Sequence, residues 1–170
     1  MATKTAEEII DLMFLPLTDN KVVETLDSLG IEQPSLDEKY EMEGRIAIID
    51  TDNSGLQFEF EELDDYDAEG EPILTTIAFD DEKRVSFPYG LHKNDSYETV
   101  VQKMGGNPDF CSKRLSFSKQ WVFPFKNSEL TMAVHFKPNM EGINTIVVGE
   151  FDRARVEKSE SIFPCNELEE

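Results

Sequence analysis

The residues whose types and spacing could do chemistry lie between positions 50 and 61. Asp50, Asp52 and Ser54 stand at the first, third and fifth positions of a twelve-residue run that ends in Glu61, with Gly55 at the sixth position. An EF-hand loop presents oxygen ligands to calcium at this spacing. The run therefore indicates a candidate calcium loop.

Three features oppose the calcium interpretation. The segment before the loop, residues 44–49, is rich in β-branched side chains where an EF-hand has a helix, and Gln57 takes the place of the apolar residue at the eighth position. No second loop of this pattern is present in the chain. A tight hairpin turn explains the same residues, so we expect no metal or cofactor and keep calcium binding as an alternative.

The residues that could support catalysis form no recognisable pattern. His92 and His135 lie far apart in the sequence, and neither begins a metal, acid–base or nucleophile motif. Cys111 lacks the signature of a catalytic thiol and has no metal-ligand spacing with Cys165. Phosphate-binding glycine loops and G-x-S-x-G elbows are also absent from the sequence. We expect a protein that is not an enzyme, with both thiols reduced in the cytoplasm.

The chain is strongly acidic. Its 170 residues include 36 Asp plus Glu against 16 Lys plus Arg, a net charge of −20. Such a charge disfavours nucleic acid and anionic membranes as partners, and a basic protein is the natural counterpart. We find neither a secretion signal nor an apolar run long enough to cross a membrane. The alternative is that the charge serves only solubility.

The acidic residues are densest between positions 59 and 71. This run holds eight acidic residues and no basic one, with Tyr66 in its middle. Carboxylates around an aromatic anchor could steer the protein toward a basic cleft, although a solvated hairpin tip is the simpler interpretation. The candidate partner-binding residues are Glu61, Glu62, Asp64, Asp65, Tyr66 and Asp67.

The elements that must position these residues begin with two short helices. A capping box from Thr5 to Glu8 predicts the first helix, and Pro16 ends it. Asp19 caps a second helix that stops at Gly30. Apolar and alternating runs then predict three strands, at residues 46–49, 56–60 and 73–79.

The second half repeats this order. Residues 87–89 echo residues 15–17, and a helix capped by Ser96 stops at Gly105. Strand-like runs follow at residues 121–125, 130–136 and 143–148. A chance likeness of two ordinary αβ segments is the alternative to a true repeat.

These elements predict an α+β protein. We expect one domain over residues 1–170, with pseudo-repeats at about 15–82 and 87–150 and a poorly ordered C-terminal tail at 152–170. Each repeat would be a helix-plus-three-strand meander unit. The two tandem units would form an antiparallel sheet of about six strands with helices on one face.

The second half resembles the helix-plus-meander unit of the BamE and beta-lactamase-inhibitory-protein group. The resemblance is carried by F-P-Y-G-L, N-D-S-Y-E-T-V-V-Q-K-M-G-G-N-P, W-V-F, L-T-M-A-V-H-F and G-I-N-T-I-V-V. In that group a helix ending in Gly-x-Pro precedes the sheet, and the inhibitory protein has two such units. The arrangement is also similar to that of many bacterial toxin-immunity proteins, which are small, acidic and cytoplasmic.

The resemblance covers residues 15–150 in outline and implies a protein that binds another protein. This chain lacks a lipoprotein signal, a secretion signal and the inhibitor's disulfide spacing. We therefore expect a cytoplasmic immunity protein that binds a cognate toxin domain, a basic nuclease, and blocks its active site or substrate groove. The alternatives are a calcium-binding module that uses the loop at residues 50–61, and an acidic adaptor or DNA-mimic protein that binds a basic host factor.

Overall fold

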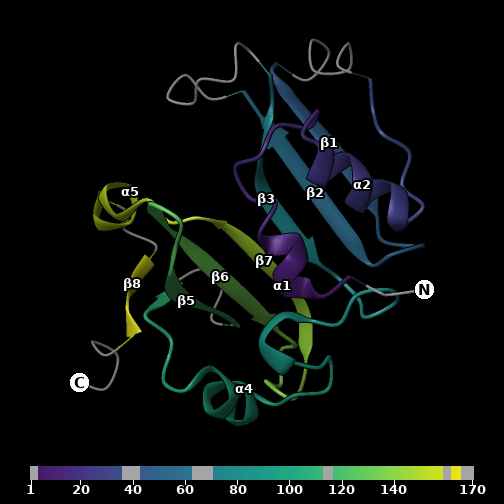
Figure 1. Cartoon of the computed structure of the whole chain (residues 1–170). Coiled ribbons are helices and arrows are strands. Elements are labelled where there is room, and N and C mark those ends of the chain that lie inside the picture. The colour runs from purple at the N-terminus through teal and green to yellow at the C-terminus, as the bar shows by residue number, and fades with distance from the viewer. Residues whose placement is uncertain (1–3, 36–42, 63–70, 113–116, 159–161, 166–170) are drawn as a thin grey trace. The chain divides into compact units, whose positions relative to one another are not determined.

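The computed structural model divides the chain into two compact units, unit 1 at residues 1–88 and unit 2 at residues 89–170. It describes all residues except 1–3, 36–42, 63–70, 113–116, 159–161 and 166–170 (Figure 1). Each unit is described by itself.

Unit 1 begins with the two helices that the capping signals predict. In α1 (Ala6–Ile10) the capping box is complete, because the Thr5 hydroxyl accepts from the Glu8 N–H and the Glu8 carboxylate accepts from the Thr5 N–H. The Asp19 carboxylate caps α2 (Asn20–Ser28), and Gly30 follows it with a φ of 71°. These local predictions are confirmed.

The sheet of unit 1 is an antiparallel meander of β1 (Arg45–Asp50), β2 (Leu56–Glu61) and β3 (Ile73–Phe79), in that spatial order. Figure 1 shows the three strands side by side. Along β2 buried and half-buried residues alternate, so that Leu56, Phe58 and Phe60 enter the core. The apolar faces of both helices are buried as well, so one core holds the unit together.

The described residues of unit 2 form five strands. The 3-10 turn η1 (Pro88–Gly90) and α4 (Tyr97–Met104) precede β4 (Phe110–Ser112), β5 (Ser118–Phe125), β6 (Ser128–Phe136) and β7 (Ile143–Glu150). Helix α5 (Arg153–Lys158) and β8 (Ile162–Pro164) end the described chain. The spatial order of the strands in this unit is β7-β6-β5-β4-β8, and all pairings are antiparallel. None of the helices in the described residues is long and apolar enough to cross a membrane.

The expected fold of two helix-plus-three-strand units with helices on one face is wrong. Strand makes up 37% of the structure and helix 21%, so antiparallel sheet dominates. Unit 2 departs furthest, because β4 and β8 add two strands that the sequence did not indicate. Each is only three residues long, too short for an alternating pattern to be visible, and each depends on its pairing partners.

The described part of the expected poorly ordered tail, residues 152–170, contains a helix and a strand, and the expectation of reduced thiols is wrong. Residues 153–158 form α5, and β8 pairs with β4. Cys111 of β4 and Cys165 are joined by a disulfide that spans 54 positions of the sequence. The bond fastens the end of the chain to the sheet.

The first stability prediction concerns Gly55, which follows the turn between β1 and β2. Its φ is 79°, and a Cβ atom there would lie 2.3 Å from the Asp81 carbonyl oxygen. Gly55→Ala should therefore lower the free energy of unfolding by about 3 kcal/mol, from backbone strain plus overpacking. Gly30→Ala is the control. The φ of Gly30 is also positive, at 71°, but a Cβ atom there would lie 3.7 Å from its nearest neighbour, so only the backbone strain remains. Denaturant unfolding should show a loss of about 1 kcal/mol there, and equal losses would contradict the account.

A second prediction concerns the disulfide. Replacing Cys111 and Cys165 together by serine should lower the stability of the oxidised protein by about 2–4 kcal/mol, because the bond restricts the unfolded chain. Urea unfolding can be followed through Trp121, the only tryptophan. Reductant should bring the wild type to the stability of the double variant and leave the variant unchanged. Unchanged wild-type stability in reductant would refute the prediction.

Candidate partner-binding site

Two of the six predicted partner-binding residues lie in the described part of the chain. Glu61 ends β2, and its Oε1 lies 3.3 Å from Nε of Arg45. The main-chain N–H of Glu62 donates to the Gly44 carbonyl at 3.0 Å. The other four fall in residues 63–70, outside the described residues: Asp64, Asp65, Tyr66 and Asp67.

The β1–β2 hairpin separates the residues of the expected calcium loop. Asp50 lies at the turn end of the ladder, whereas Glu61 lies opposite Arg45 at the other end. Five residues of extended strand separate these two ends by about 17 Å. The Ser54 hydroxyl donates to the Asp50 carbonyl at 3.1 Å, and Asp52 lies in the turn between them. The structure therefore does not bring Glu61 to the other three residues, which form a hairpin turn.

Two half-buried titratable groups of unit 2, His135 and Lys119, lie against neighbouring side chains. Burial lowers the pKa of His135, whose ring lies 6.1 Å from that of Phe117 between centroids. Burial also lowers the pKa of Lys119, whose Nζ lies 3.7 Å from Sγ of Cys111. Within the residues that the structure describes, no three His, Cys, Asp or Glu side chains are placed to hold a metal ion.

The net charge is divided unevenly between the two units. Residues 1–88 hold 24 acidic and 6 basic residues, a net charge of −18, and residues 89–170 hold 12 and 10, a net charge of −2. Together these give the −20 of the whole chain. A charge that served only solubility would not need to gather on one unit. The predicted pseudo-repeats, at about 15–82 and 87–150, meet close to the same boundary, so the asymmetry can be counted from the sequence alone.

Three basic side chains in the described part of unit 1 differ in what they contact. Arg45 contacts the carboxylates of both Glu59 and Glu61. Lys83 and Arg84 instead donate to main-chain carbonyl oxygens, at 2.9 and 3.2 Å. Unit 1 therefore produces a strongly negative potential that attracts cationic groups.

Unit 2 carries a second candidate surface, a groove of about 340 Å³ that the sequence did not indicate. Tyr89 lines it, is 40% exposed, and has a φ of 57°, which is unusual for a bulky residue. Its ring meets that of Phe123 edge-on, with the centroids 5.7 Å apart. Trp121 also lines the groove and donates its indole N–H to the Gly106 carbonyl at 3.1 Å. An aromatic lining of this kind suits an apolar side chain or a small ligand.

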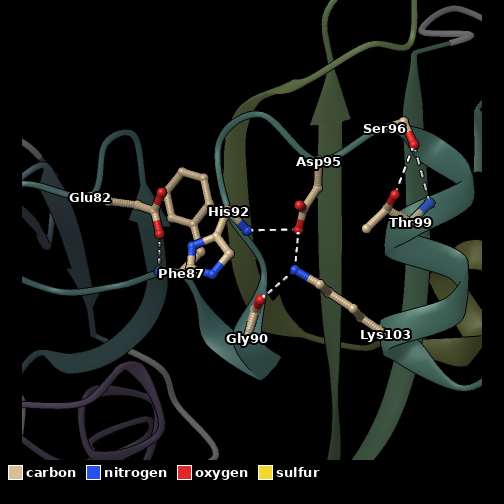
Figure 2. A network of polar contacts seen from close by, with 8 residues as sticks. All are labelled: Glu82, Phe87, Gly90, His92, Asp95, Ser96, Thr99 and Lys103. Atoms are coloured by element: carbon tan, nitrogen blue, oxygen red, sulfur yellow. Dashed lines mark hydrogen bonds and ion pairs between the residues drawn. The ribbon is translucent and has the colours of Figure 1, made fainter.

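Lys103, which lines this groove, also belongs to the polar network that Figure 2 shows. Oδ2 of Asp95 accepts from the main-chain N–H of His92 and from Nζ of Lys103, both at 2.8 Å. The same Nζ donates to the Gly90 carbonyl at 2.8 Å. The network ties the segment that follows Tyr89 to α4, so it positions one wall of the groove.

Comparisons with known proteins leave the family open. No family model matches the chain, and no curated protein matches it. Among solved structures, the chain is similar to the crystal structure of an extracellular protein containing an SCP domain from Bacillus anthracis str. Ames. That similarity covers 96% of this chain and 51% of the other, with a TM-score of 0.55 and 10% identity. This chain spans about half the length of that protein, and at such identity the likeness concerns the fold alone.

The network next to the groove yields a prediction by double-mutant cycle. The Asp95 and Lys103 side chains are only 13% and 31% exposed. Their ion pair should therefore stabilise the fold more than a fully exposed ion pair does. Asp95→Ala combined with Lys103→Met should show a coupling energy of about 1–2 kcal/mol in urea unfolding. The control cycle combines Glu141→Ala with Lys103→Met. Because Glu141 is an exposed carboxylate, this cycle should show no coupling energy. A coupling near zero for both pairs would contradict the proposed role of the network.

Proposed function

We propose that this chain is a non-enzymatic binding protein that uses unit 1 to cover a basic surface of another protein. The specific role that we propose is an immunity protein against a toxin domain, a basic nuclease. The observation that carries the proposal is the net charge of −18 on residues 1–88 beside −2 on residues 89–170. A nuclease groove attracts phosphates through cationic side chains, and carboxylates can occupy the same positions.

The proposed contact lies at the end of the β1–β2 hairpin away from its turn. Glu61 and Glu62 are placed there, directly before residues 63–70. Asp64, Asp65 and Asp67 would add charge, and Tyr66 would supply an aromatic anchor of the kind that dominates binding energy at interfaces. The long-range attraction mainly raises the association rate.

The disulfide indicates the redox state of the compartment in which the protein works. Bonds of this kind persist in oxidising compartments and are rare in a reducing cytoplasm. The bond between Cys111 and Cys165 therefore favours an oxidising compartment over the cytoplasm expected from the sequence.

The test begins with capture of the partner from a lysate of the source organism and its identification by mass spectrometry. Reversing Asp64, Asp65 and Asp67 to Lys should then weaken binding about tenfold or more at low salt and make the affinity less salt-dependent. The measurement is calorimetric titration at several salt concentrations.

The control reverses three acidic residues of unit 2 that are exposed, Glu98, Glu141 and Asp152, and so changes the net charge equally. We expect a much smaller loss of affinity from this variant. Equal losses would show that only total charge matters and would refute a site on unit 1. Binding of a basic protein that is not a toxin would keep the site but replace the immunity role by that of an adaptor.

A further inference from the structure

Among the described residues, only one edge of the β1 main chain is paired with another strand. In the described part of the chain, β2 is the only strand that pairs with β1. The Glu62 N–H donates to the carbonyl of Gly44, which directly precedes β1, so every second position from there, including Ile46 and Ile48, faces β2. In an antiparallel ladder the bonded pairs alternate. Arg45, Ala47 and Ile49 therefore direct their N–H and C=O groups away from β2, along the free edge.

This edge lacks the features by which proteins usually prevent strand addition. The β1 sequence contains no proline or lysine, and its register with β2 has no bulge. Arg45 is the only cation of the strand, and its guanidinium contacts Glu59 and Glu61 of β2. Ala47 is exposed, and Ile49 is 72% exposed, the most exposed large apolar side chain among the described residues. In the part of the chain that the structure describes, no strand pairs with this edge, and Ile49 gives it an exposed apolar side chain.

We propose that the free edge of β1 receives an extended, basic segment of the partner as an additional antiparallel strand. This inference rests on the proposed function for the charge of the partner. Main-chain hydrogen bonds to positions 45, 47 and 49 would supply affinity, as in other proteins that bind peptides by strand addition.

Charge and side-chain alternation select the occupant. An added strand would point alternate side chains to the face that carries Ala47 and Ile49, and that face also carries Glu59 and Glu61. Lysine or arginine at those positions suits the carboxylates, and the aliphatic stems can pack on Ile49. The intervening side chains would lie beside Ile46 and Ile48 and should be apolar. A second copy of this chain fits poorly, because two units of charge −18 repel each other.

The probe is a synthetic seven-residue peptide of alternating lysine and valine that begins and ends with lysine. In the proposed pairing the lysine N–H groups face β1 and the valine N–H groups face solvent. A peptide with N-methylated lysines should bind about tenfold or more weakly than the parent, because it loses the donors that pair with β1. A peptide with N-methylated valines has the same charge and should bind within about threefold of the parent.

A pair of protein variants tests the same edge. Ile49→Lys puts a cation on the edge and should weaken binding of the parent peptide about tenfold. Asn20→Lys adds the same charge at an exposed position of α2 and should change binding by about twofold or less. Unchanged melting temperatures show that both variants fold. Amide hydrogen exchange should slow at Ala47 and Ile49 when the parent peptide binds.

The outcomes separate this inference from the proposed function. Equal binding of both methylated peptides, together with equal losses for Ile49→Lys and Asn20→Lys, would leave an acidic binding surface and overturn strand addition. Failure of the parent peptide to bind even at low salt would overturn strand addition, and it would contradict the proposed function only if the captured partner also failed to bind unit 1. Amide exchange at Ala47 should also be measured without peptide at several protein concentrations. Exchange that slows as the protein concentration rises would assign the edge to a second copy of the chain and overturn the proposal.

Discussion

Unit 1 must bury an apolar core while it carries a net charge of −18, and the alternation along β2 satisfies both requirements. Leu56, Phe58 and Phe60 enter the core, whereas Glu59 and Glu61 stay on the opposite face. A shift of one residue in register would bury the carboxylates, which is prohibitive without partners. The core thus fixes the register, and the register fixes which face is acidic.

Unit 2 solves a different problem, because its last elements are short. Strands β4 and β8 are each three residues long and have few main-chain hydrogen bonds to contribute. The disulfide between Cys111 and Cys165 joins this region covalently, and β5 supports β4 from the other side. The net charge of unit 2 is only −2, so unit 2 has fewer unbalanced carboxylates to keep out of its core than unit 1 has.

The predictable features of the fold were those encoded over a few neighbouring residues. Helix caps at Thr5, Asp19 and Ser96 need only a side chain and a nearby N–H, and strands such as β2 show their period within six residues. The disulfide, β4 and β8 depend on contacts between distant positions, which no local pattern reveals. The groove beside Tyr89 is formed by residues from η1, α4 and β5, so the sequence could not predict it either. The concentration of acidic residues in the first half could be counted from the sequence, because the predicted boundary between the pseudo-repeats lies close to residue 88.

The central claim is that unit 1 carries the binding function through its negative charge. Hydrogen–deuterium exchange of the complex with the captured partner tests this claim most directly, because it reports on both units at once. The account predicts slower exchange on complex formation within residues 45–82 and little change in residues 89–170. Slower exchange confined to residues 89–170, around the aromatic groove, would contradict it.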